Sequence, residues 1–466
     1  MVSLPRPRPS AAGPAAALGP GFTRYLCGES AGLVGTSVHL VALPALAVLE
    51  LHATAGQAAL LASLAHLPTF LLALPAGAVV DRHAKRGLLV GTDLAGAAAV
   101  AAVPAASLAG VLSMPVLYAV ALVVGAVTVL HQAAALAIVP QLVAPALLHR
   151  ANARVGAAFG ASETAGTYLG TVVVAVVGAA RAFWLDALSY LVSAWCAARI
   201  PERGRPVPGA GGGARHRYRF AGEIAEGLAY TARTALVRDL VLALTLTGWG
   251  VGMTGALSSY YLLTTLAVGP TGLGIVMGVS GAGALGGALL APRIVARFGP
   301  GPTLLAGFAT CPAAGVPLLL AGPGPGWLAV LAAAGALQLA GAAVAGTTQR
   351  SLRQQICPPQ LQARAQQTST WLVSGSKPFA ALTAGALATG YGTRTALLVG
   401  TLLLAAPVAV LWPSPVSRLT TMPLTAGPPA DGALRTAPPP TGAALLGEQD
   451  PARPSASDPS PKEPTP

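Results

Sequence analysis

The chain has 466 residues, of which 54% are hydrophobic and only 9% are charged. Such a chain cannot cover one soluble core and still present a charged surface, so the composition indicates an integral membrane protein. The formal net charge is +13, but the basic residues punctuate apolar runs instead of clustering on a solvated domain, which argues against nucleic acid as a partner.

The first 200 residues contain a tail followed by six apolar runs. Residues 1–20 are rich in Pro and Ala and lack the cleavage pattern of a signal peptide, so we expect a disordered cytosolic tail. Each apolar run has roughly the 20 residues that a helix needs to cross a bilayer core. The predicted spans of this N-terminal half, residues 21–200, are 22–48, 56–80, 87–110, 114–139, 154–178 and 182–199.

A polar, basic stretch separates these runs from six more. Residues 201–237 are predicted to form a cytosolic linker, in which residues 218–231 are typical of an amphipathic helix on the inner leaflet. Pro, Ser, Thr and acidic residues dominate residues 414–466, which we expect to be a disordered cytosolic tail. The predicted spans of the C-terminal half, residues 238–413, are 238–264, 271–295, 302–321, 326–348, 366–388 and 395–412.

The distribution of basic residues supports this layout, because Lys and Arg concentrate in cytosolic loops. Of the 28 Lys and Arg residues, only Arg181 and Arg394 fall in predicted outer loops, and only Lys377 lies deep inside a span. A layout shifted by one span would reverse this bias. We therefore expect both termini to be cytosolic.

The two halves also share a sequence repeat. Residues 145–151 (PALLHRA) recur as residues 359–365 (PQLQARA), and Arg181 and Arg394 are separated by nearly the same interval. Transporters are often built from such repeated halves. The repeat predicts duplicated six-helix halves.

A short charged turn joins the second and third predicted spans and resembles the signature loop of the major facilitator superfamily. The residues that carry this resemblance are Gly77, Asp81, Arg82, Lys85 and Arg86. Residues 74–76 (LPA) and Asp93, which lies shortly into the next span, resemble the branch that contains the enterobactin exporter and the macrolide efflux pumps. Ala84 departs from the superfamily, which usually has Gly there.

The resemblance implies an all-α fold of twelve transmembrane helices in two pseudo-symmetric six-helix halves. It also implies that the charged turn and Asp93 form a gating loop, which latches the two halves in the outward-facing state. A helix that begins after Arg364 would present its N-terminus nearby, and would stabilise an anion such as Asp81 by about 0.3 to 2 kcal/mol. The alternative is that the turn carries ordinary cytosolic loop charge.

Ionisable side chains at bilayer depth are costly unless paired or hydrated, so they are candidates for proton coupling or substrate binding. Five stand out in the predicted spans, namely Glu29, His39, His131, Glu163 and Lys377, with His66 as a weaker sixth and Gln132 beside His131. In the superfamily the first and fourth helices line the central cavity, so the resemblance predicts that Glu29 meets His131. The branch usually has other residues at these positions, so its coupling site is not transferred. Alternatively, the histidines are neutral hydrogen-bonding groups that fix helix contacts.

Glu163 and Lys377 are separated by the same interval as the two copies of the repeat. They therefore occupy equivalent depths in the fifth and eleventh spans, which both border the central cavity in the superfamily. An acid and a base there could pair in one state and separate in another, so that Glu163 takes up a proton when the pair breaks. A static ion pair, or two charges that select a substrate, is the alternative.

The expected cavity walls are mostly small and apolar, with a few large aromatic residues. Such a lining suits an amphipathic or hydrophobic organic molecule. The aromatic candidates are Trp249, Tyr260, Tyr261 and Trp371. The alternative for each of them is an interfacial anchor.

These patterns predict an exporter of a small organic molecule, such as a drug, siderophore or secondary metabolite, which works by proton antiport in the bacterial plasma membrane. Its partners would be the substrate, protons and the lipid bilayer, and the chain would be monomeric. An uptake permease of the same fold and a transport-inactive scaffold or sensor remain alternatives. The sequence has neither a catalytic motif nor a metal-ligand or disulfide spacing of its four cysteines, so we expect no enzyme activity, metal or cofactor.

The charge bias yields a testable topology. Single cysteines placed in a cysteine-free background at both termini and between residues 205 and 215 are expected to resist a membrane-impermeant thiol reagent in intact cells. They should react once the membrane is permeabilised. Labelling of the 205–215 stretch from outside intact cells would overturn the topology.

Overall fold

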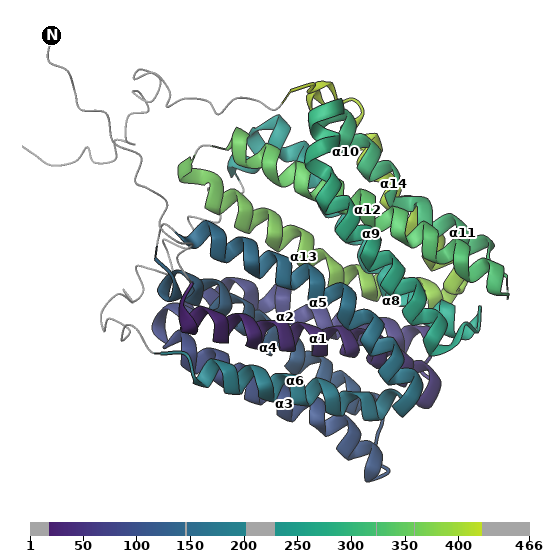
Figure 1. Cartoon of the computed structure of the whole chain (residues 1–466). Helices are drawn as coiled ribbons and strands as arrows, with labels where there is room; N and C mark the ends of the chain where they lie inside the picture. The colour runs from purple at the N-terminus through teal and green to yellow at the C-terminus, as the bar shows by residue number, and fades with distance from the viewer. Residues whose placement is uncertain (1–17, 145–146, 202–228, 323, 358, 422–466) are drawn as a thin grey trace, which may run out of the picture. The chain divides into compact units, whose positions relative to one another are not determined.

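The computed structural model describes residues 18–144, 147–201, 229–322, 324–357 and 359–421 (Figure 1). The regular elements within these ranges are all helical. Most of both predicted tails, most of the predicted linker and most of the predicted amphipathic helix at 218–231 lie outside the described residues. The described ends of the tails are ordered, contrary to the prediction: Gly19 already begins the first helix, and residues 415–418 form a 3₁₀ turn.

The first half consists of six long helices that run side by side along the bundle (Figure 1). The first helix continues as a short π-helical turn, η1 (Leu46–Glu50). The helix after it, α2, begins with a capping box in which Thr54 and Gln57 satisfy each other's backbone amides. The six helices are α1 (Gly19–Ala45), α2 (Ala55–Arg82), α3 (Lys85–Leu108), α4 (Met114–Leu142), α5 (Leu148–Val177) and α6 (Ala179–Ala198).

The second half repeats this arrangement, with one segment broken into pieces. That segment runs as α10 (Pro300–Ala309), a 3₁₀ turn η3 (Cys311–Ala314) and α11 (Gly315–Leu320). Pro312 and Pro317 lie at the break, and proline lacks the amide hydrogen that continues an α-helix. The other helices are α8 (Ala235–Thr264), α9 (Gly269–Phe298), α12 (Pro325–Ile356), α13 (Pro359–Tyr391) and α14 (Thr393–Leu411), which is followed by the turn η4 (Pro415–Arg418).

The architecture confirms the predicted fold of twelve helical segments in two six-helix halves. Among the described residues, nine segments are long and apolar enough to cross a membrane by themselves. The other three are α5, α6 and α13. Several helices extend past the ends of the predicted spans: the span predicted over 326–348 belongs to α12, which continues to Ile356, because a helix can extend beyond the hydrocarbon core.

The predicted repeat is visible in the backbone. Gly178 and Gly392, which are separated by the interval of the sequence repeat, have nearly the same positive-φ conformation, with φ of 86° and 90°. Each follows the fifth helix of its half and starts the sixth, α6 or α14. Only glycine adopts this conformation without strain, so the chain reverses direction through the same backbone conformation in both halves.

The two halves meet at the end of the bundle predicted to face outward. Here Gly56 and Ala59 on α2 lie against Thr389 and Gly385 on α13, and Thr171 on α5 lies against α9. One buried hydrophobic cluster combines α13 residues with residues of η1 and α2. These small residues let helices from opposite halves approach closely.

Within the second half, α9 and α12 pack through small residues spaced four apart. Gly283 and Gly287 on α9 lie directly against Ala336 and Ala340 on α12, so that a Cβ at either glycine would collide with a carbonyl oxygen of α12. The intervening Gly286 faces open space. Close packing of this kind replaces the hydrophobic effect as the force that holds helices together in lipid.

This contact predicts a position-specific effect on stability. Gly287→Ala should lower the stability of the purified protein by about 1 to 3 kcal/mol, because the added methyl group forces the two helices apart. Thermal unfolding in detergent measures the loss. Gly286→Ala is the matched control and should leave the unfolding temperature unchanged or raise it, so equal losses from both variants would contradict the packing.

Candidate functional site

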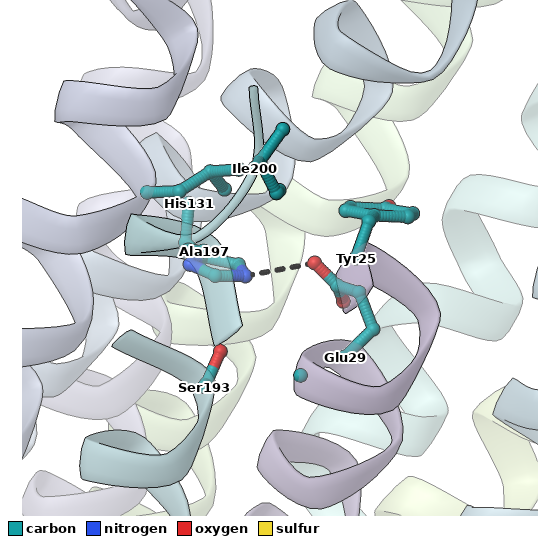
Figure 2. A pocket seen from close by; sticks show the side chains of 8 residues that line it. Tyr25, Glu29, His131, Ser193, Ala197 and Ile200 are labelled. Atoms are coloured by element: carbon teal, nitrogen blue, oxygen red, sulfur yellow. Dashed lines mark hydrogen bonds and ion pairs between the residues drawn. The ribbon is translucent and has the colours of Figure 1, made fainter. Parts of the chain in front are cut away.

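Three ionisable side chains from three helices of the first half meet inside the bundle. His131 of α4 lies between Glu29 of α1 and Asp93 of α3: its Nε2 is 3.0 Å from Oε1 of Glu29 and its Nδ1 is 3.0 Å from Oδ1 of Asp93. Figure 2 shows the His131 ring pointing at the Glu29 carboxylate. The contact expected between Glu29 and His131 is thus present, and Asp93 completes a Glu29–His131–Asp93 cluster.

The protonation of this cluster follows from its geometry. A carboxylate can only accept a hydrogen bond, and a neutral imidazole has only one N–H. Both ring nitrogens of His131 face carboxylate oxygens, so the cluster holds either an imidazolium or one protonated carboxyl group. In that state it carries a net charge of −1, and one further proton makes it neutral.

Burial makes this charge costly. Asp93 is only 1% exposed, and its Oδ2 has no hydrogen-bond partner among the described residues. The hydroxyl of Thr92 lies 3.3 Å from the ring nitrogen that faces Asp93. A buried carboxylate oxygen without a partner is unfavourable, so the free oxygen of Asp93 adds to the cost of burying the charged cluster.

A small pocket borders the cluster. Its empty volume is about 190 Å³. Figure 2 shows Tyr25 and Glu29 approaching it from one side and His131 from the other. Lining residues include Tyr25, Glu29, His131, Ser193, Ala197 and Ile200. These side chains come from α1, α4 and the end of α6, so the pocket lies within the first half.

A second acid–histidine pair lies farther along α1. Nδ1 of His39 is 2.9 Å from Oδ2 of Asp186 on α6, and the imidazole packs edge-on against Phe183 at 5.2 Å between ring centres. Asp186 is 1% exposed, and its Oδ1 lacks a hydrogen-bond partner within the part of the chain that the structure describes. We call these two residues the His39–Asp186 pair.

Glycines make room for the side chains around the Glu29–His131–Asp93 cluster and the His39–Asp186 pair. A Cβ at Gly35 of α1 would collide with the Ser189 hydroxyl and lie 2.7 Å from Oδ1 of Asp186. A Cβ at Gly96, one turn after Asp93, would lie 2.7 Å from the ring of Tyr190. Tyr190 interacts electrostatically with both Asp93 and Asp186 and hydrogen-bonds Thr128. Tyr190 is therefore close enough to interact with an acidic residue of the cluster and with that of the pair.

The predicted gating loop is a tight connection between α2, which ends at Arg82, and α3, which begins at Lys85. The Lys85 ammonium donates to the carbonyl oxygens of Val80 and His83 and so caps the end of α2. Gly77 and Arg82 are exposed and Arg86 is half-buried. The Asp81 side chain lies outside the described residues, so its latch role stays a prediction. The gating role of Asp93 also stays a prediction, and its carboxylate contacts His131.

The predicted Glu163–Lys377 pair is not tested by the structure. Glu163 belongs to α5 and Lys377 to α13, as expected, but the Glu163 side chain lies outside the description. Lys377 is half-buried, with its backbone against Gly252 of α8. Gln132 is exposed and does not contribute to the cluster.

The aromatic candidates fall into two groups. Tyr261 is 2% exposed in the core of the second half, and the partly buried Trp249 and Tyr260 pack on that core. A substrate role for these three residues stays a prediction. Trp371 of α13 stacks on Phe70 of α2, with 5.3 Å between ring centres, and its Nε1 donates to the Phe70 carbonyl oxygen. Trp371 thus connects the two halves.

Sequence reasoning missed Asp186 and the pairing of Asp93 with His131. Asp186 is an acidic residue inside the predicted span 182–199, and this isolated charge is the signal that could have found it. The resemblance assigns Asp93 to the loop, although the residue lies well inside α3. Among the described residues, which are the ones searched, no group of His, Cys, Asp and Glu side chains is arranged to hold a metal ion.

Comparisons with known proteins agree with this architecture. A model of the Major Facilitator Superfamily matches residues 26–376. A mutant of the nucleoside transporter NupG is 12% identical, with a TM-score of 0.69 over 84% of this chain and 99% of that one. A bacterial homologue of the iron transporter ferroportin, in an inward-facing state, is 16% identical, with a TM-score of 0.64 over 84% and 98%. A bacterial homologue of the human lysosomal transporter Spinster is 15% identical, with a TM-score of 0.62 over 86% and 97%. No curated protein sequence matches the chain.

The cluster predicts a coupled effect on stability. His131→Leu should destabilise the protein by about 3 to 5 kcal/mol, because it removes the hydrogen-bonding partner of buried Asp93 and of partly buried Glu29. Adding Glu29→Gln should recover part of the loss, which a double-mutant cycle of thermal unfolding measures. The control is His83→Leu at an exposed histidine. A loss that is unchanged by the second substitution would contradict the ion pairing.

Proposed function

Because the chain belongs to the Major Facilitator Superfamily, we propose that it is a secondary active transporter that exports a small amphipathic or hydrophobic organic molecule by proton antiport. The membership and the twelve-helix fold make it a multi-pass membrane transporter. Export, proton coupling, a monomeric state and the plasma membrane as its location belong to the proposal.

The observation that carries proton coupling is the Glu29–His131–Asp93 cluster. Two carboxylates share one imidazole at 3.0 Å on each side, and the three residues lie on α1, α3 and α4, each of which is long and apolar enough to cross a membrane. The cluster can alternate between a net charge of −1 and zero by binding one proton. A change of that size alters the cost of burial, and therefore which conformation of the transporter is favoured.

Antiport requires that the proton and the substrate favour different states. The anionic cluster is more stable in an open conformation of the transporter, in which water hydrates it. The neutral cluster can be enclosed by the protein at a lower cost in free energy. The small pocket beside Glu29 gives water a place next to the cluster. Glu29 is about one-fifth exposed, whereas Asp93 is buried, so Glu29 is the member through which the proton enters and leaves.

The substrate class rests on the chemistry of the helices. They are mostly apolar, with few charges, in a chain of which 5% is aromatic, and this suits an organic molecule with a hydrophobic body better than a sugar or phosphate. The outward direction of transport rests on the charged turn from Gly77 and on the preceding residues 74–76, which resemble an exporter branch.

The decisive experiment separates coupling from binding. Inverted membrane vesicles are energised with a pH gradient and screened with labelled hydrophobic compounds, and the compound that the unaltered protein accumulates is then used throughout. Glu29→Gln should reduce gradient-driven transport at least tenfold, because the cluster can no longer change its charge in the same way. Substrate exchange without a gradient should be retained.

Glu50→Gln is the matched control, since this exposed acid accepts a backbone hydrogen bond from Ala180 that glutamine can also accept. It should transport normally. Normal driven transport by the Glu29 variant would remove this residue as the coupling acid. Accumulation in cells instead of extrusion would identify an uptake permease, and no transport of any compound would favour a scaffold or sensor.

A further inference from the structure

We propose that the His39–Asp186 pair is a second proton-binding site in the first half, separate from the Glu29–His131–Asp93 cluster and linked to it through Tyr190. The proposal concerns proton binding alone. It does not depend on the direction of transport or on the identity of the substrate.

The pair has the same construction as the cluster. In each case a carboxylate that is 1% exposed gives one oxygen to an imidazole nitrogen, at 2.9 Å for Asp186 and 3.0 Å for Asp93. In each case its other oxygen is buried without a hydrogen-bond partner among the described residues. A static ion pair selected for stability would be expected to satisfy both oxygens, because an unpaired buried acceptor is costly.

Proton uptake at the pair has a simple balance. When His39 is neutral and Asp186 is ionised, the pair carries one negative charge. A hydronium ion gives up a proton and leaves a water molecule; the proton forms an O–H bond on the free oxygen of Asp186, or an N–H bond on His39, and the net charge of the pair becomes zero. No other reactant is needed, and the uncompensated charge inside the apolar bundle is removed.

The surroundings of Asp186 contain few other charges. His39 faces it from α1, and Asp93 of α3 interacts with Tyr190, which belongs to α6 itself. At the predicted outer end, Glu50 bonds the amide of Ala180 at the start of α6. The helix α5, which also packs on α6, presents no charged side chain there in the described part of the chain. Among the described side chains, His39 is therefore the group that can supply a positive charge to Asp186.

Tyr190 links the two sites. It follows Asp186 on α6 by about one helical turn, which places it nearer the predicted cytosolic end. Its hydroxyl is hydrogen-bonded to Thr128 of α4, and it interacts electrostatically with both Asp93 and Asp186. Gly35 and Gly96 leave the space that this arrangement occupies. A proton bound at one site therefore changes the electrostatic potential at the other.

The test reads carboxyl protonation directly and needs no substrate. Purified protein in lipid vesicles is titrated between about pH 4 and pH 9, a range that covers ordinary and strongly shifted carboxyl groups. Attenuated total reflection infrared spectroscopy follows the carbonyl band of protonated carboxyl groups. Asp186→Asn should remove the intensity of one carboxyl group from this band, and Asp93→Asn should remove a different component.

Two further variants keep the test decisive. His39→Gln preserves a hydrogen-bond donor to Asp186 but cannot bind a proton, so it should shift the midpoint of the Asp186 component while the protein stays folded. Asp239→Asn, at a carboxylate held by Arg238 and Ser414 near the start of α8, is the control and should leave the Asp186 component intact. A titration of Asp186→Asn identical to that of the unaltered protein would show a static pair and overturn the proposal. That result would leave the role of Glu29 in transport untouched.

Discussion

The negative charge of a carboxylate inside a bilayer must be compensated by neighbouring side chains. In the first half of this protein, histidines do this. Glu29 and Asp93 share His131, and Asp186 uses His39. Because the partners lie on different helices, the pairing fixes how α1, α3, α4 and α6 can be arranged. The arrangement of these four helices therefore depends on charge as well as on packing. A change in protonation alters interactions that all four helices make.

The two halves share a topology but differ in how their helices are held. In the second half, Gly283 and Gly287 give α9 and α12 a close contact of backbone against backbone. In the first half, Gly35 and Gly96 make space for polar side chains instead, namely those of Asp186, Ser189 and Tyr190. Small residues thus serve backbone packing at the α9–α12 contact and make room for polar side chains beside Gly35 and Gly96, although Gly125 and Gly170 also give the first half close backbone contacts. Duplicated halves can diverge in this way because a glycine leaves open what fills the space beside it.

Most of the fold could be predicted from the sequence, because apolar runs of about 20 residues and the placement of Arg and Lys reflect the bilayer directly. Hydropathy predicts one continuous span around Pro312, since it does not register a break that proline causes. The Glu29–His131 contact could be predicted because both residues are ionisable and lie at similar depth. The pairing of His39 with Asp186 could not, since it depends on the close approach of α1 and α6 at Gly35, which only the three-dimensional arrangement shows.

The distance between the Glu29–His131–Asp93 cluster and the His39–Asp186 pair has an electrical consequence. Glu29 and His39 lie on the same helix, α1, and their separation in the sequence corresponds to about 15 Å along the helix axis, or roughly half of the hydrocarbon core. A charge that crosses the whole membrane gains about 2.3 kcal/mol per 100 mV, so a proton that moves from one group to the other gains about half of that. The membrane voltage would therefore influence which of the two groups binds the proton. Depolarisation of the cell would change the distribution of the proton between them even at constant pH.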